Sequence, residues 1–345
     1  MVHDLNLSGR VSLKFCEPCV LGKSTKLKFP KKSEFRATRT LQLIHTDVCG
    51  PISPESPGGS KYFLTFTDDY SRVTWVIPLK QKSQVFEELK AFIEYQEKVR
   101  RQSVECIRSD NGGEYTSNQI ESWLKGKRIR HEKTVPYCPQ QNGISERVNR
   151  TLCDRASSML HGAELPATLW CEALLTAAYI KNRSPTTAIE NKTPFEMFHG
   201  TKPSVKHFRV FGCRAYAYLN KNDRDGKFSE KAEVCTFIGY DLESKGYRLW
   251  SDNRRQVIIR RHVRFDESSF GNNTLNKNDC NDENEDFTAS KFVYPINPNA
   301  NSQVIDCSQN ESCDTEGVLE NLSPEENTRE SQHGKDQKEV RRTDR

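Results

Sequence analysis

The sequence lacks any long apolar run. The 345-residue chain contains no stretch of eighteen consecutive apolar residues and no N-terminal apolar segment of the kind that directs secretion. Neither secretion nor a membrane span is indicated, and we expect no membrane partner. Apolar residues make up only 34% of the chain and charged residues 29%, a balance that is typical of a protein with an unfolded part.

The cysteines lack the arrangement of a disulfide framework. Twelve are scattered along the chain, mostly within apolar runs, which in a chain this long indicates reduced thiols inside a cell. One pair stands apart, because Cys16 and Cys19 have the C-x-x-C spacing of half a tetrahedral zinc site. Only His3 lies upstream, so the histidine half of such a site is missing and a complete Zn²⁺ site is not expected.

Acidic residues are scarce in the first 270 residues and abundant after them. Residues 271–345 contain 16 acidic and 8 basic residues, a net charge of −8, so residues 1–270 must carry +13 for the chain to total +5. A basic folded part suits an anionic polymer as partner, although a merely soluble basic surface would give the same balance. Residues 269–345 are poor in large apolar side chains, so we expect a disordered acidic tail.

Hydrophobic periodicity predicts a mixed α/β sheet flanked by helices within residues 36–200. Apolar or alternating runs predict strands at 41–48, 61–66, 73–79, 104–108 and 130–135. Spacings of three and four residues predict helices at 84–100, at 118–125, around Glu146 and at 168–181. In the helix that carries Glu146, we expect the core to be faced by Ile144, Val148, Leu152, Met159 and Leu160. Three strands followed by alternating helices and strands are typical of this fold class.

Residues 205–268 predict a small β-rich domain. Alternating runs at 210–218, 235–240, 246–250 and 257–265 are separated by polar turns. Short strands with this spacing indicate a small barrel or sandwich.

Three acidic residues occur where a predicted strand ends or a helix begins. Asp47 and Asp110 end the first and fourth strands, and Glu146 follows Asp110 with thirty-five residues between them. Each acid alone would be read as a solvated surface charge. Together they could converge on two Mg²⁺ or Mn²⁺ ions, with Asp47 bridging both. Such a centre stabilises the attacking and leaving oxygens in phosphoryl transfer on nucleic acid.

Six neighbouring residues are candidates for contact with DNA. Arg147 and Arg150 could hold phosphates beside the carboxylates, although solvated helix charges are the alternative. Contacts with DNA ends could also come from a mobile loop that contains Tyr137, Gln140, Gln141 and Asn142.

Four ordered blocks resemble the integrase of copia-type LTR retrotransposons. They read IHTDVCGPI, KYFLTFTDDYSRVTWVIPL, RSDNGGEY and PQQNGISERVNRTL, and the resemblance covers roughly residues 10–268. It implies an RNase H-like catalytic core at 36–200, dependence on a divalent metal, and joining of element DNA ends into target DNA. The family's D,D-35-E triad corresponds to Asp47, Asp110 and Glu146. The resemblance also implies a homo-oligomer that acts on DNA in the nucleus, or in a cytoplasmic particle before nuclear entry.

The chain departs from this family at two places. Cys16 and Cys19 match the cysteines of the family's His/His/Cys/Cys domain, so residues 1–30 are expected to be a truncated remnant of that zinc-binding pre-integrase domain. In the last strand, Arg261 is followed by His262 where the family usually has an acid. The chain therefore resembles a piece of a longer Pol polyprotein.

Two alternative functions remain open at the level of sequence. A catalytically inactive, element-derived nucleic-acid-binding fragment would keep the three acids by inheritance alone. A ribonuclease H is less consistent with the sequence, because the last acid is a Glu early in a helix and the additional clustered acids of a hybrid nuclease are absent.

Overall fold

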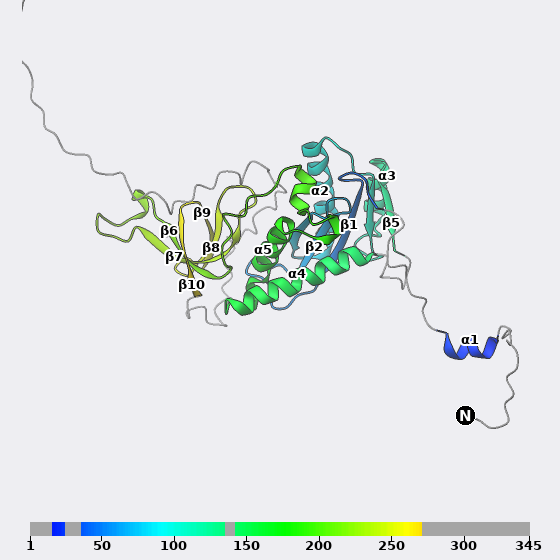
Figure 1. The fold of residues 1–345 in the computed structure, drawn as a ribbon, viewed down its shortest axis with the longest axis horizontal. Coiled ribbons are helices and arrows are strands. Elements are labelled where there is room, and N and C mark those ends of the chain that lie inside the picture. Colours follow the sequence, from blue (N-terminus) through cyan, green and yellow to red (C-terminus); the bar gives the residue numbers. More distant parts are fainter. Residues whose placement is uncertain (1–15, 25–35, 135–141, 271–345) are drawn as a thin grey trace, which may run out of the picture. The chain divides into compact units, whose positions relative to one another are not determined.

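The computed structural model describes residues 16–24, 36–134 and 142–270 of the chain. Its first sheet has five strands, with helices packed on its faces (Figure 1). The strands are β1 (Leu43–Cys49), β2 (Tyr62–Asp68), β3 (Thr74–Leu79), β4 (Cys106–Ser109) and β5 (Arg130–Lys133). Their order is β3-β2-β1-β4-β5, in which β1 is central, antiparallel to β2 and parallel to β4. The predicted mixed α/β class is confirmed.

The helices are α1 (Glu17–Lys23), α2 (Val85–Arg100), α3 (Asn118–Gly126), α4 (Gly143–Gly162), α5 (Trp170–Arg183) and α6 (Pro194–His199). Four of these helices, α2 to α5, lie where the periodicity predicts them, and α1 and α6 were not predicted. On α2, Leu89, Phe92 and Ile93 are buried against the sheet, and Phe92 stacks on Phe66 of β2. No described helix combines the length and the apolar character needed to cross a membrane.

The predicted core face of α4 is confirmed only in part. Leu152 and Leu160 are buried, and Val148 and Met159 pack against the same cluster. In the first two turns, however, Ser145 and Asn149 are buried and Ile144 is only partly buried. The reason is that this part of α4 packs on the sheet through polar contacts with β1 and β2, described below. Apolar periodicity alone does not detect such a face.

The two acidic residues at the turn between β2 and β3 are buried and make structural hydrogen bonds. Asp68 is fully buried and accepts hydrogen bonds from the Leu41 amide (2.8 Å) and from the Ser71 amide and hydroxyl. Asp69 accepts from the Ala37 amide (2.8 Å) and contacts His45 (3.0 Å). These bonds fasten the segment before β1, and thereby fix the strand that carries Asp47.

The second sheet is antiparallel and has the order β10-β6-β7-β8-β9. Its strands are β6 (Cys213–Tyr218), β7 (Ala232–Tyr240), β8 (Tyr247–Ser251), β9 (Gln256–Arg260) and β10 (Val263–Phe270). The prediction of one strand at 257–265 is wrong: the chain turns at Arg261 and His262, because β9 pairs with β8 whereas β10 pairs with β6.

The second sheet shares a core with α4 and α5. Ile238 and Trp250 belong to the same buried cluster as Leu152 and Leu174. Arg248 of β8 makes a two-pronged ion pair with Glu172 of α5, with Nε–Oε2 and Nη2–Oε1 distances of 2.8 and 2.6 Å. The boundaries predicted for the four domains stay a prediction, and the tail after residue 270 lies outside the described residues.

Candidate active site

Asp47 occupies the central strand of the first sheet, near its carboxyl end. The residue is half-buried, and it pairs with Thr65 of the neighbouring β2. Burial, together with the negative charges of Asp110 and Glu146, raises the pKa of the Asp47 carboxyl to about 7.

Asp110 lies directly after β4 and beside Asp47. The parallel register pairs Ile44 with Ile107 and His45 with Arg108. Continued by two residues, it sets Asp110 opposite Asp47 on adjacent strands, which in a sheet lie about 5 Å apart. The Gly112 amide donates a 3.0 Å hydrogen bond to Oδ1 of Asp110 and so holds the carboxylate at the start of the loop.

Glu146 lies in the first turn of α4 and is exposed. It reaches the neighbourhood of Asp47 because α4 crosses β1, and its charge contributes to the raised pKa of Asp47. The three acids therefore come from a central strand, an adjacent strand end and a helix, as the spacing predicts.

The three carboxylates are neighbours but do not form a closed ligand set. Within residues 16–24, 36–134 and 142–270, no three His, Cys, Asp or Glu side chains lie close enough together to hold a metal ion. The predicted convergence of Asp47, Asp110 and Glu146 on two ions stays a prediction.

A polar network that the sequence analysis did not predict ties α4 to the sheet. Asn149 donates a 2.8 Å hydrogen bond to Oδ2 of Asp47 and accepts one of 2.9 Å from the Thr65 hydroxyl. One feature of the sequence could have pointed to Asn149 as a site residue: it lies three residues after Glu146, on an adjacent side of the same helix.

Only some of the predicted DNA contacts can be located. Arg147 and Arg150 are exposed on α4 beside Glu146. Asn142 is buried instead, and its side-chain amide donates to the Thr46 carbonyl at 3.2 Å. Tyr137, Gln140 and Gln141 lie outside the described residues. All of these DNA contacts stay predictions.

The predicted zinc pair occupies the short helix α1 and its N-cap. Cys16 and Cys19 are both exposed, and a hydrogen bond between them lowers the pKa of the Cys16 thiol. No additional His, Cys, Asp or Glu completes a metal site around them in the described part of the chain, and His3 lies outside it.

Two family models match the chain. The model described as "Integrase core domain" matches residues 37–139, and the one described as "Retroviral polymerase SH3-like domain" matches residues 213–279. The first range contains Asp47 and Asp110, and the second begins at β6.

Several plant transposon proteins are similar in sequence. A retrovirus-related Pol polyprotein from transposon TNT 1-94 of Nicotiana tabacum is 45% identical over 257 residues, which are 74% of this chain and 19% of the polyprotein. The polyprotein from transposon RE1 of Arabidopsis thaliana is 35% identical over 256 residues, 74% of this chain and 17% of the polyprotein. The chain thus spans less than a fifth of the length of these relatives.

Solved structures of integrases resemble the chain more distantly. A chain of the simian T-cell lymphotropic virus intasome, in complex with PP2A regulatory subunit B56 gamma, has 17% identity and a TM-score of 0.44, covering 72% of this chain and 87% of that one. The HTLV-2 integrase catalytic core domain in complex with magnesium has 18% identity and a TM-score of 0.37, covering 48% and 100%. On the sequence matches, the chain belongs with the integrase region of retrotransposon Pol polyproteins.

Proposed function

We propose that this chain catalyses the metal-dependent joining of element DNA ends into target DNA. The observation that carries the proposal is the electrostatic coupling of Asp47 to Asp110 and Glu146, three acids from three separate elements. Their order and spacing support the same function, as does the match of residues 37–139 to an integrase core.

The three carboxylates suit Mg²⁺ or Mn²⁺. Hard cations prefer carboxylate oxygens, and a dication would offset the burial and the repulsion that together raise the pKa of Asp47 to about 7. We propose Asp47, Asp110 and Glu146 as the ligands. Two such ions, when bound, would supply charge stabilisation to the attacking and leaving oxygens of the phosphodiester.

Other residues of the chain would orient these groups and the DNA. The hydrogen bond from Asn149 fixes the Asp47 carboxylate, so that its second oxygen stays available. Arg147 and Arg150 are exposed beside Glu146, where guanidinium groups would hold DNA phosphates. We further propose a homo-oligomer that acts in the nucleus, where target DNA lies.

The test is a strand-transfer and disintegration assay on labelled DNA with Mg²⁺ or Mn²⁺. Glu146→Gln keeps the shape of the side chain and removes its charge, so we expect activity to fall about a hundredfold or more. Glu94→Gln, on the exposed side of α2, makes the same chemical change away from the site and should keep full activity. Equal activity of Glu146→Gln and the unchanged chain would refute the assignment.

An inactive nucleic-acid-binding fragment is the second candidate. It is favoured by the lack of a closed three-ligand set among the described residues. The two candidates differ in one result: the inactive fragment would retain labelled DNA in a salt-dependent manner and give no joined product with either metal.

A further inference from the structure

A second site is suggested by a cationic pocket on the far side of α4. The pocket has a volume of about 470 Å³ and lies between the β2–β3 turn, one side of α4, the end of α5 and the loop that follows it. Four of its lining residues are cationic: Arg72, Arg147, Arg155 and Lys181. No lining residue is acidic. The pocket therefore concentrates positive charge on a small concave surface.

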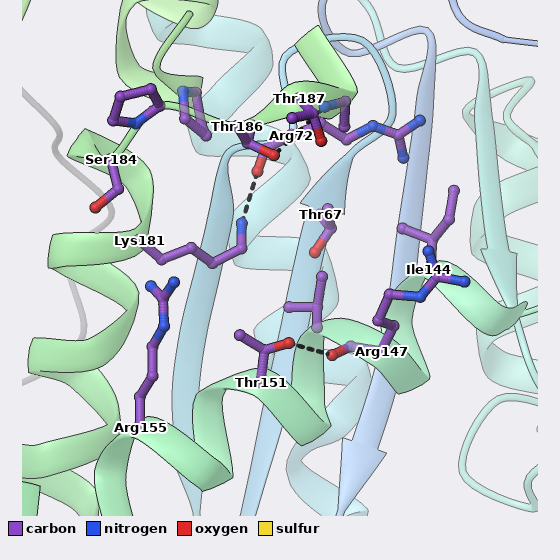
Figure 2. Close-up of a pocket in the computed structure, with 14 residues that line it drawn as sticks. Thr67, Arg72, Ile144, Arg147, Thr151, Arg155, Lys181, Ser184, Thr186 and Thr187 are labelled. Atoms are coloured by element: carbon purple, nitrogen blue, oxygen red, sulfur yellow. Dashed lines mark hydrogen bonds between the residues drawn. The ribbon is translucent and has the colours of Figure 1, made fainter. Parts of the chain in front are cut away.

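No acidic side chain of the pocket lining offsets the charge of Lys181. Its ammonium group donates a 2.9 Å hydrogen bond to the Arg72 carbonyl (Figure 2) and another of 2.9 Å to the Thr74 hydroxyl, and both acceptors are uncharged. Burial, together with the positive charges of Arg155 and Arg72, lowers the pKa of Lys181 to about 7. An anion in the pocket would remove this repulsion.

The arginines retain capacity to bind a ligand. Arg147 and Arg155 are exposed, and neither makes an ion pair with any residue of the described ranges. Arg72 pairs with Asp69 at 3.2 Å, but its Nε is buried and has no hydrogen-bond partner among the described residues. Figure 2 shows Lys181 and Arg155 approaching from one side and Arg147 from the other.

The hydroxyl groups of the pocket contribute less than the cations. Thr151 donates to the Arg147 carbonyl at 2.9 Å, and Ser184 donates to the Ile180 carbonyl at 2.8 Å. These two hydroxyl protons are already used within the protein, so the charged donors available to a ligand are the guanidinium groups and the remaining ammonium proton of Lys181. Several such donors around one point are what a tetrahedral oxyanion requires.

The two principal cations of the pocket, Lys181 and Arg155, lie away from the candidate active site, and Arg147 borders both. Arg155 follows Glu146 by nine residues, which is two and a half helical turns, so the two side chains leave α4 on opposite sides. Asn149 instead lies on the side of α4 that faces the sheet, where it contacts Asp47. An anion held by Lys181 and Arg155 is thus not the phosphodiester that the carboxylates would act on.

We propose that this pocket binds the phosphate group of a nucleotide, with Lys181 and Arg155 as its principal ligands and Arg147 and Arg72 around them. The pocket volume falls within the range of small-molecule sites and is larger than the volume that a bare phosphate would occupy. Val148 and Pro185 supply an apolar wall for the attached group. The nucleotide can be free or part of a DNA strand, since both present the same chemistry.

The test is calorimetric titration of the full chain in EDTA, so that no divalent metal recruits phosphate to the carboxylates. The probes are inorganic phosphate, thymidine monophosphate and a twelve-nucleotide single strand. The variants are Arg155→Gln, an exposed change compatible with folding, and Lys181→Met. Lys98→Gln on α2 is the matched control, because it removes one exposed positive charge outside the pocket.

We expect saturable phosphate binding that weakens about tenfold in Arg155→Gln and Lys181→Met and is unchanged in Lys98→Gln. Glu146→Gln should also bind phosphate normally, which separates this site from the proposed catalytic function. A mononucleotide that binds more tightly than the strand identifies a free nucleotide as the source, and the reverse order identifies DNA. Absence of saturable binding, or equal weakening in Lys98→Gln, would overturn the proposal.

Discussion

Asn149 of α4 donates a 2.8 Å hydrogen bond to the Asp47 carboxylate of β1. The same side chain accepts from Thr65 of β2, so one amide joins the helix that carries Glu146 to the two strands below it. The position of Glu146 relative to Asp47 therefore depends on Asn149 as well as on the backbone.

Asn149→Ala should reduce strand-transfer activity and destabilise the fold by about 1–3 kcal/mol, because Thr65 loses its buried acceptor. Asn149→Asp should also reduce activity, since a fourth acid would lie next to Asp47. Urea unfolding and the joining assay measure the two effects separately. Ser157→Ala, exposed on the same helix, should change neither quantity; unaltered activity in both Asn149 variants would show that the hydrogen bond does not position the carboxylate.

Glu172 and Arg248 connect α5 to the second sheet through a nearly buried ion pair, with side-chain exposures of 9% and 13%. Glu172→Gln removes the carboxylate from this ion pair, so we expect a loss of about 3–5 kcal/mol. The double variant Glu172→Leu with Arg248→Met should lose less than the single change. A double-mutant cycle in urea measures the coupling, and additive effects would mean that the pair contributes no interaction of its own.

Both the backbone conformation at position 212 and the space around it require a glycine. Its φ is +82°, and a Cβ there would lie 2.1 Å from the Ala163 Cβ. Gly200 has a similar φ of +76° but open space around it. Gly200→Ala should cost about 1–2 kcal/mol from backbone strain alone, and Gly212→Ala about 1–3 kcal/mol more from the clash. Equal unfolding free energies of the two variants would show that the loop before β6 can move away from Ala163.

Lys181 should make stability depend on pH between about 7 and 10. Its pKa is about 7 in the folded chain and near 10.5 when unfolded, so the unfolded state binds more protons across this interval and raising the pH favours folding. The Lys181 contribution is fully present above pH 10.5 and is lost as pH falls towards 7.

The measurement is urea unfolding at pH 7, 8 and 9 in phosphate-free buffer, because a bound anion would restore the charged form. The difference in unfolding free energy between the unchanged chain and Lys181→Met should grow by up to about 1.4 kcal/mol per pH unit. Lys98→Met should show no such trend. A pH-independent difference for Lys181→Met would mean that the ammonium is solvated in the folded chain.

The sequence by itself determined the elements and their order. Alternation and three- to four-residue spacing are local properties of the chain, and they predict β1 to β5 and the helices between them. The same local signals set Asp47 and Asp110 at strand ends and Glu146 at a helix start, and the four blocks indicate the family. One local prediction failed at Arg261, where an unbroken alternation conceals a change of pairing partner.

Only the tertiary structure decided which polar residues are buried and what they contact. Asp68 and Asp69 hold the segment before β1 through buried hydrogen bonds, and Asn149 holds Asp47, and none of these contacts was predicted from the sequence. The cationic pocket joins Arg72 to Lys181 across more than a hundred residues of sequence. Hydrogen bonds and desolvation depend on distances between segments remote in the chain, and no periodicity within a segment encodes those distances.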